Sequence, residues 1–485
     1  MIQLFCQQVH AADFQFRKDD RISRAHGLIY ELRFSEARRL LSQVRSDHPT
    51  DLSAELEEMT ILFLEAFITE DLQRFSDFEK KADRFLDDVA DAQAAPEKGM
   101  ASAAVYLQWS VLEARNDEYL EAAWHLRQSN VAATDNQIEY PGFVPDDAVY
   151  GVLQCILGAV PPEYEWLLSV IGMQGSLQKG KSILQGFLKQ TEKSDYTMYH
   201  SEALFFLSHL QTTLYADTEP DPYLMSCLGR DALSNDLLLQ AYTGILLRNE
   251  GNDEVVRLLQ SHTVKAGVFP LPGLKYRLGM ARLRKFDRAC IADFRSYIRL
   301  SNGKSLCKSS YQKIAWMRLI ENDMTGYKTA MSDCIRYGES KVDEDKAALQ
   351  EAEKGPVPDR DLLKARLAFD AGYYAVALQT AKATDPALLS SVSGLERTYR
   401  IARIHQAMGQ DDLAIAGFMK AVKSVDKSGS HYPANSAFQL GIIFEKRRQP
   451  DSARTYYKLC LSMPDHAYKN SIDQKAKAAL VRVGE

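Results

Sequence analysis

Residues 175–182 (GSLQKGKS) have the glycine, lysine and serine spacing of the loop that binds phosphate in nucleotide triphosphatases. In such a loop, backbone N–H groups surround the phosphates, the lysine neutralises them and the serine ligates magnesium. The loop must follow a strand, but residues 161–163 (PPE) are a helix-start signal, and no strand–helix units follow. We therefore expect one helix to end near Gly172 to Gly175 and another to begin near Ser176. Nucleotide binding at residues 175–182 stays an alternative.

The other residue types that could do chemistry are scattered. The ten histidines form no metalloprotease motif, and His125, His209 and His405 lie in apolar helical stretches where packing is the simpler role. The seven cysteines show no C-x-x-C pair and are expected to be small core residues. The acidic runs 146–147 and 343–345 fall at expected helix starts, where carboxylates are favoured by the helix dipole. The sequence therefore predicts no enzyme, and no catalytic, cofactor-binding or metal-binding residue.

The elements that would hold any site are helices. Apolar residues recur at spacings of three and four, and short polar or Pro/Gly clusters separate the segments. Apolar residues make up 46% of the chain and glycine plus proline are few, which excludes disordered, collagen-like and loop-rich all-β proteins. A length of 485 residues fits about three domains or one long repeat array.

Residues 362–382 show most clearly how these helices pair. Small residues, among them Ala365, Ala368, Ala377 and Ala381, fall where two helices must approach closely, which predicts a helical hairpin.

The same pattern recurs along the chain. The search requires an alanine anchor in the second helix, a small residue twelve before it, an aromatic three before it and a large apolar residue four after it. Ala37, with Ala25, Phe34 and Leu41, comes closest to a complete tetratricopeptide signature. The anchors are Ala37, Ala122, Ala289, Ala377, Ala414 and Ala453. A single hairpin cannot bury its apolar face, so the predicted fold is all-α, a tetratricopeptide-like helical-hairpin solenoid (superhelix).

Several short motifs carry a family resemblance: residues 161–175 (PPEYEWLLSVIGMQG), Gly180, Leu184, residues 315–316 (AW), 345–349 (DKAAL) and 475–480 (KAKAAL). Together they resemble the tetratricopeptide repeat protein 39 and inclusion-body-clearance family of eukaryotes, and more closely the exported bacterial relatives of that family in the Bacteroidota. The resemblance implies an all-helical repeat protein without established catalytic residues. It therefore assigns no functional residue to this chain.

Four segments are expected: a tail or signal-peptide remnant (1–12), N-terminal helical repeats (13–160), a central helical segment with the Pro-Pro motif (161–270) and C-terminal tetratricopeptide repeats (271–485). No apolar run reaches the roughly 18 residues of a membrane helix. Residues 9–11 (VHA) have the form of a signal-peptide cleavage site. We expect a periplasmic or otherwise exported protein, with a cytoplasmic protein as the alternative.

The expected function is partner binding by the first helices of the hairpins. The net charge of −6 with interspersed signs offers no basic field for nucleic acid. Stacked hairpins present a groove lined by first helices, and such grooves bind peptides or helices of other proteins. The predicted function is a non-catalytic scaffold, with lipid or glycan binding by an exported protein as an alternative. The groove-facing residues are Leu362, Arg366, Phe369, Tyr399, Arg403, Gln406, Phe438, Ile442 and Glu445.

Overall fold

The computed structural model describes residues 14–160, 172–192, 195–214, 219–301, 304–385, 389–424 and 429–484, and these residues are all-α. Among the described residues, Gln15 and Asp51 form an isolated parallel β-bridge. The described residues confirm the tetratricopeptide-like hairpin fold. None of their helices combines the length and apolarity needed to cross a membrane. The expected tail (1–12) and most of the Pro-Pro motif lie outside the described residues.

The chain divides into two compact units. The first unit comprises residues 1–249, 258–277 and 300–304, and the second comprises residues 250–257, 278–299 and 305–485. The prediction of four segments stays a prediction.

The first unit holds α1 (Asp20–Tyr30), α2 (Phe34–Asp47), α3 (Leu52–Thr69), α4 (Leu72–Ala90), α5 (Pro96–Arg115), α6 (Tyr119–Glu139), α7 (Asp146–Gly158), α9 (Leu177–Thr191), η2 (Thr197–Tyr199), α10 (His200–Thr213), α11 (Pro222–Asp231) and α12 (Asp236–Arg248). The division between the units passes through α13 (Asn252–Leu259) and α14 (Gly273–Arg284), and Leu300, the last residue of α15 (Cys290–Leu300), belongs to the first unit.

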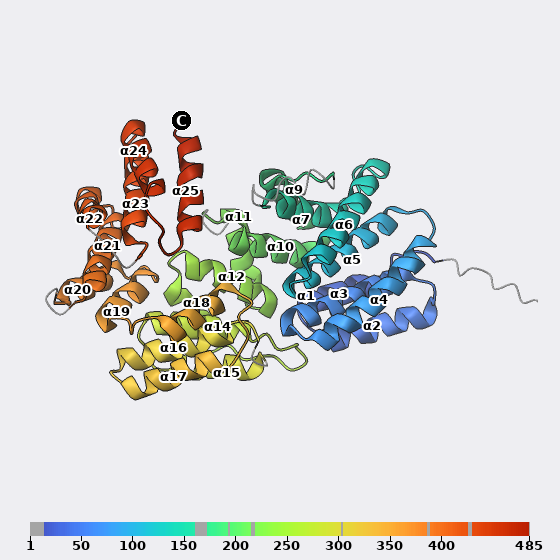
Figure 1. Ribbon diagram of the computed structural model, residues 1–485. Helices are drawn as coiled ribbons and strands as arrows, with labels where there is room; N and C mark the ends of the chain where they lie inside the picture. The colour runs from blue at the N-terminus through green and yellow to red at the C-terminus, as the bar shows by residue number, and fades with distance from the viewer. Residues whose placement is uncertain are drawn as a thin grey trace, which may run out of the picture. The chain divides into compact units, whose positions relative to one another are not determined.

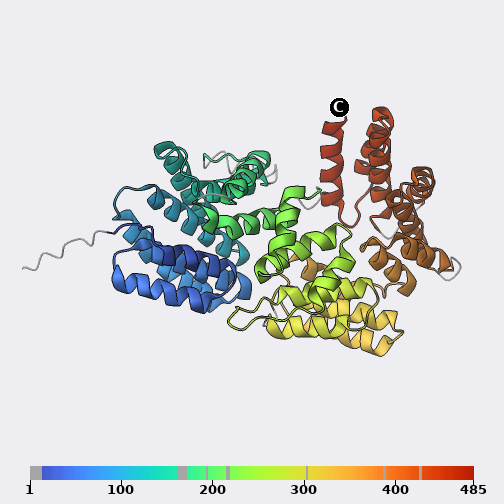
Figure 2. The same ribbon diagram turned by 180° about the vertical axis from the view of Figure 1, so that it is seen from behind.

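The second unit holds α15 (Cys290–Leu300), α16 (Cys307–Ile320), α17 (Met324–Arg336), α18 (Asp343–Lys354), α19 (Arg360–Phe369), α20 (Tyr374–Ala383), α21 (Ser391–Ala407), α22 (Asp411–Lys423), α23 (Tyr432–Lys446), α24 (Pro450–Leu461) and α25 (Lys469–Arg482). Within each unit successive helices pack side by side: α1 to α6 in the first and α19 to α24 in the second (Figures 1 and 2).

Many of the hairpin turns share one backbone geometry. Between α21 and α22, Gly409 has a φ of 73°, and the N–H of Gln410 donates to the carbonyl of His405 at 2.8 Å. This is the Schellman motif, which ends a helix with one left-handed residue. Other described turns repeat this bond, and their left-handed residues are Leu32, Asp117, Phe286, Asn322, Gly372 and Arg448.

The left-handed residue fixes the register of each repeat. The predicted anchors Ala37, Ala122, Ala377, Ala414 and Ala453 each lie five residues after it and are buried. An alanine is needed because a first helix crosses closely at this point. These five anchors are confirmed.

The sixth anchor, Ala289, is wrong. It is exposed and precedes α15. The residue five after the left-handed Phe286 is Ile291, which is buried, and the small residue twelve before it is Gly279. A Cβ at Gly279 would lie 2.9 Å from the ring of Phe294, so this glycine does permit the close approach that the pattern requires.

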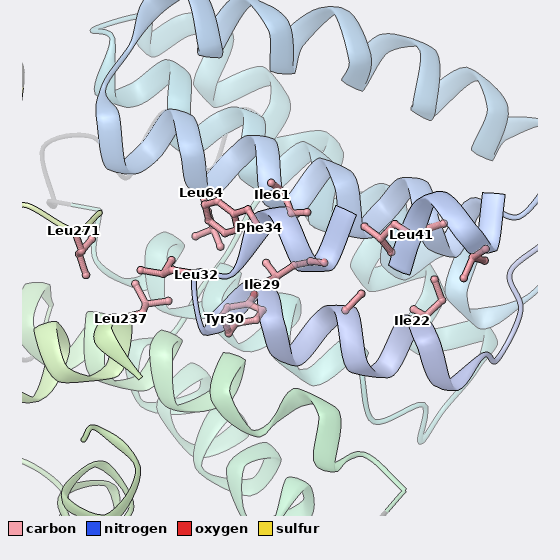
Figure 3. Close-up of a cluster of buried hydrophobic side chains, with 14 residues drawn as sticks. Ile22, Ile29, Tyr30, Leu32, Phe34, Leu41, Ile61, Leu64, Leu237 and Leu271 are labelled. Carbon is pink, nitrogen blue, oxygen red and sulfur yellow. The ribbon is translucent and has the colours of Figure 1, made fainter. Parts of the chain in front are cut away.

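The core of the first hairpin also includes residues from much later in the chain. Buried side chains of α1, α2 and α3 form one cluster with Leu237 of α12 and Leu271 (Figure 3). Fully buried members such as Ile29 and Leu41 face the neighbouring helices, as the spacing of three and four predicts. The cluster therefore joins helices that are separated by about half of the chain.

The acidic runs lie at helix starts as expected, but one member has a different role. Asp345 is in the first turn of α18, yet its carboxylate accepts the N–H groups of Leu306 and Ser309 at 2.6 and 2.8 Å. These donors belong to the start of α16, where N–H groups have no partner within the helix. Asp345 thus fastens α18 onto the neighbouring hairpin.

Candidate functional site

The stretch with the phosphate-loop spacing is mostly helix. As expected, α9 begins after Ser176, whose hydroxyl accepts the N–H of Lys179. The N–H of Gly180 donates within the helix to the carbonyl of Ser176 at 2.9 Å. A Cβ at Gly175 would lie 2.3 Å from Leu157, and one at Gly180 would lie 2.5 Å from Cys155. Both glycines therefore serve the contact of α9 with α7, and we do not propose nucleotide binding here.

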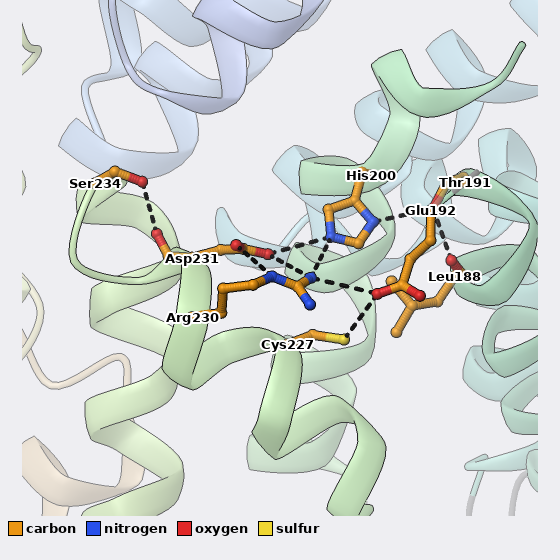
Figure 4. A network of polar contacts seen from close by, with 8 residues as sticks. All are labelled: Leu188, Thr191, Glu192, His200, Cys227, Arg230, Asp231 and Ser234. Atoms are coloured by element: carbon orange, nitrogen blue, oxygen red, sulfur yellow. Dashed lines mark hydrogen bonds and ion pairs between the residues drawn. The ribbon is translucent and has the colours of Figure 1, made fainter. Parts of the chain in front are cut away.

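A polar network that includes a cysteine, a histidine and carboxylates links α9, α10 and α11 (Figure 4). The thiol of Cys227 donates to Glu192 at 3.6 Å, and His200 Nε2 lies 3.2 Å from Asp231. Arg230 bridges Glu192 and Asp231. Burial is the main cause that raises the pKa of the Cys227 thiol, which makes the thiolate scarce. The network fits a structural link rather than a nucleophilic site.

Three carboxylates approach one another elsewhere in the first unit. Oxygens of Glu79, Glu113 and Glu118 lie within 4.8 Å of one another. Burial, then Glu118 and Glu79, raises the pKa of Glu113 to about 8, and His125 Nδ1 lies 2.8 Å from it. An acidic cluster alone does not define a metal site, so we assign no ion here.

The predicted groove residues include a group that the structure brings together. Arg403 of α21 donates through Nη1 to Gln406 and to Gln439 of α23, both at 2.7 Å. Its guanidinium carbon lies 5.5 Å from the centre of the Phe369 ring on α19. One arginine thus connects the first helices of three successive hairpins.

A second arginine continues this arrangement toward the preceding hairpin. The guanidinium carbon of Arg366 on α19 lies 4.4 Å from the centre of the Trp316 indole on α16. Lys313 Nζ lies 4.0 Å from the same indole and donates to the neutral amide of Gln312. We call Lys313, Trp316, Arg366, Phe369, Arg403 and Gln439 the first-helix face.

The cations of this face are poorly neutralised. Lys313, Arg366 and Arg403 form no ion pair with any described carboxylate, and Arg366 Nη2 is buried without a hydrogen-bond partner. Glu351 is near, but its oxygens accept from Gln312 and from the Trp316 indole.

Burial and repulsion from a neighbouring arginine act on two of these cations, Lys313 and Arg366. Burial first, then Arg366, lowers the pKa of Lys313 to about 8. Burial first, then Arg400, lowers the pKa of Arg366. The first-helix face therefore holds two desolvated cations, Lys313 and Arg366, on the Trp316 ring, and the half-buried Arg403 continues the row over the Phe369 ring.

Other predicted groove residues have different surroundings. Tyr399 and Leu362 are buried, and the Tyr399 ring of α21 packs against Phe418 of α22 in the same hairpin. Glu445 accepts the hydroxyl of Tyr457 at 2.6 Å and the guanidinium of Arg482 on α25.

The half-buried Phe438 lies 5.7 Å from the Tyr457 ring, centre to centre. Because Tyr399 and Leu362 serve the core, we leave both out of the proposed contact surface.

The sequence search missed Lys313 and Trp316 for an identifiable reason. The hairpin of α16 and α17 has the left-handed Asn322, so its anchor position, five residues later, is Tyr327. The small residue twelve before it is Ala315, which is fully buried. A search that accepted any buried residue at the anchor would have found this hairpin, and with it the neighbouring Trp316.

A scan against protein-family models and a search of curated proteins each gave no match. A structure of the human IFIT1 dimer with m7Gppp-AAAA is similar at 10% identity and a TM-score of 0.33, covering 96% of each chain. A structure of the APC/C hetero-tetramer Cut9–Hcn1 is similar at 10% identity and a TM-score of 0.24, covering 95% of each chain. These scores are too low to indicate what this chain binds. The fold assignment rests on the hairpin geometry described above.

Proposed function

We propose that this protein is a non-catalytic scaffold that binds an extended acidic segment of a partner protein along the first-helix face of its second unit. The observation that carries the proposal is the row of Lys313, Arg366 and Arg403, three cations that lie on aromatic rings and form no ion pair with a described carboxylate. Carboxylates of a partner would supply the missing counter-charges, and arginine binds carboxylate with two parallel hydrogen bonds.

The composition of the face favours a peptide over other ligands. Arginine and tryptophan are the residue types that most often dominate protein–protein contacts. Nucleic acid is the less favoured partner, because the net charge of the chain is −6 and the three cations stand among aromatic and amide groups. No observation specifically favours the lipid or glycan alternative.

We also propose a family and a cellular compartment for this protein. The motif resemblance supports a member of the tetratricopeptide repeat protein 39 and inclusion-body-clearance group of the exported bacterial kind. Periplasmic or other export is supported by residues 9–11 (VHA). Sequencing the N-terminus of the native protein tests this point, since a start at Ala12 or Asp13 would establish cleavage and an intact Met1 would refute it.

The partner is found by cross-linking a C-terminally tagged full chain in its native cell, followed by mass spectrometry. We expect a stoichiometric protein with an acidic segment, and a synthetic peptide of that segment should bind the purified chain. Arg403→Glu should weaken peptide binding by about 10-fold or more, because it adds repulsion to the loss of charge-assisted hydrogen bonds.

The matched control is Arg295→Glu, which makes the same charge change at an exposed position of the second helix α15. It should leave the affinity within about twofold of wild type. Full affinity in a helical Arg403→Glu variant, or equal losses in both variants, would show that the first-helix face is not the binding surface.

A further inference from the structure

A different cation group lies in the first unit, where Arg277 of α14 is enclosed without a counter-charge. Its Nε is buried and has no hydrogen-bond partner. No described carboxylate forms an ion pair with it. Burial first, then the nearby cation Arg248, lowers the pKa of Arg277 to about 10. An enclosed charge without a partner is costly, so folded proteins almost always pair such groups.

The fold makes room for this guanidinium. Gly244 of α12 lies against Arg277, and a Cβ there would be 2.5 Å from Nη1 and 2.9 Å from Nη2. Any other residue at position 244 would have to displace the guanidinium. Arg277 is only half-buried as a residue, so part of the side chain still reaches solvent from this enclosed position.

The described groups near Arg277 do not neutralise its charge. His209 is exposed to solvent, yet desolvation first, then the charges of Arg115 and Arg277, lowers its pKa to about 4, so this imidazole is neutral at pH 7. No acid among the described residues bonds to its ring. Arg115 lies 4.3 Å from the Phe67 ring centre, and the His209 ring lies 6.1 Å from the same ring. Glu70 pairs with Arg115, and no carboxylate in the described part of the chain forms an ion pair with Arg277 or Arg248.

The helix dipole accounts for some of these cations but not for Arg277. Arg115 and Arg248 are the last residues of α5 and α12, where a positive charge is favoured. Arg277 is in the interior of α14, where the dipole offers nothing comparable. The uncompensated charge at Arg277 therefore needs another explanation.

We propose that Arg277, with Arg248 and His209, forms a binding site for a small oxyanion, either a phosphate or a carboxylate group. The guanidinium presents several N–H donors in a fixed plane, which matches two oxygens of either group. The neutral imidazole of His209 supplies a further N–H donor. This site is in the first unit and is independent of the proposed partner binding in the second.

The test is titration calorimetry of the full chain with inorganic phosphate and, separately, with acetate, at constant ionic strength made up with sodium chloride. We expect saturable heat and a higher melting temperature with at least one anion, because a ligand that binds the folded state stabilises it. Tighter binding of phosphate would identify a phosphorylated ligand, and tighter binding of acetate a carboxylic acid. Absence of saturation with both would overturn the proposal.

Variants assign the effect to Arg277. Arg277→Met should weaken anion binding by about 10-fold or more, since it removes charge-assisted hydrogen bonds. It should leave the melting temperature without anion unchanged or higher, because it removes a charge that has no ion pair among the described residues. Gly244→Ala keeps the charge but displaces the guanidinium, so it should weaken binding too.

The control is Arg39→Met at an exposed position of α2, which should change neither binding nor stability measurably. Unchanged binding in Arg277→Met and Gly244→Ala would overturn the proposal. If Arg277→Met lowers the melting temperature and Gly244→Ala binds as wild type, Arg277 is a packing residue and the site does not exist.

Discussion

Alanine at two glycines of one hairpin should change stability in opposite directions. Gly409 is the left-handed residue between α21 and α22, with a φ of 73°. Gly394 is in α21 itself. A Cβ at either position would meet no atom within 4 Å, so packing does not enter and backbone conformation alone decides the outcome.

The two magnitudes follow from the conformations. At Gly409 a left-handed alanine costs about 1–2 kcal/mol, partly offset by about 0.4–1 kcal/mol from a less flexible unfolded chain. Gly409→Ala should therefore destabilise the hairpin by about 1 kcal/mol. At Gly394 alanine is favoured in a helix by about 0.5–1 kcal/mol. The two variants should thus differ by about 1.5–2 kcal/mol.

Native-state hydrogen exchange of the α21 and α22 amides measures these changes locally, which suits a repeat protein whose parts open separately. Faster exchange is expected in Gly409→Ala and slower exchange in Gly394→Ala. The same direction of change in both variants, or no loss of protection in Gly409→Ala, would refute the assigned turn geometry.

Other substitutions test the same structure elsewhere. Arg448→Gly should stabilise the hairpin of α23 and α24 by about 1 kcal/mol, because the exposed Arg448 is held at a φ of 57° that glycine adopts freely. Amide hydrogen exchange in both helices should therefore become slower. Ala414→Leu should cost about 1–3 kcal/mol in thermal unfolding, since Ala414 is fully buried, and no loss would contradict the register. Burial opposes protonation of His26, but the charge and hydrogen bond of Glu57 and the charge of Glu202 raise its pKa to about 9. The stability from this group is therefore complete below about pH 6.5 and is lost as pH rises through 9. A histidine NMR titration should give a midpoint near 9 for His26, and a midpoint near 6.5 would refute the buried ion pair.

The sequence predicts the hairpins where small residues meet. Pairs such as Ala365 with Ala377 let two helices pack closely because both side chains are small. A search for small residues at this spacing therefore finds them. The turns are harder, because the left-handed position is often not glycine. Phe286 and Arg448 adopt it because the Schellman bond and the packing of both helices compensate the strain, and this tertiary effect leaves no local signal.

The candidate sites were predictable to different degrees. Arg366, Phe369 and Arg403 follow from the register of the first helices. The structure brings Phe369 and Arg403 together with Gln439, and Arg366 lies on the Trp316 ring. Arg277 could not be recognised in the sequence. Whether an arginine is paired depends on which acid folds beside it, and neither composition nor spacing states that.

Methionine variants of paired and unpaired arginines distinguish a role in ligand binding from a role in stability. The chain has 65 acidic and 59 basic residues, so acids are not scarce, yet neither Arg277 nor Arg366 forms an ion pair with an acid in the described part of the chain. Arg38 is the opposite case, because its guanidinium donates to Glu58 and Glu65 at 2.9 Å. Methionine at Arg38 should lower the melting temperature, since it removes the 2.9 Å ion pairs of two mostly buried carboxylates and leaves Glu65 with Arg74 at 2.8 Å and Glu58 with Arg45 at 4.0 Å. Methionine at Arg277 or Arg366 removes a charge that the folded chain does not satisfy, so it should leave the melting temperature unchanged or higher while ligand binding falls. A lower melting temperature at all three positions would mean that these arginines support the fold, and the reasoning for both binding sites would fail together.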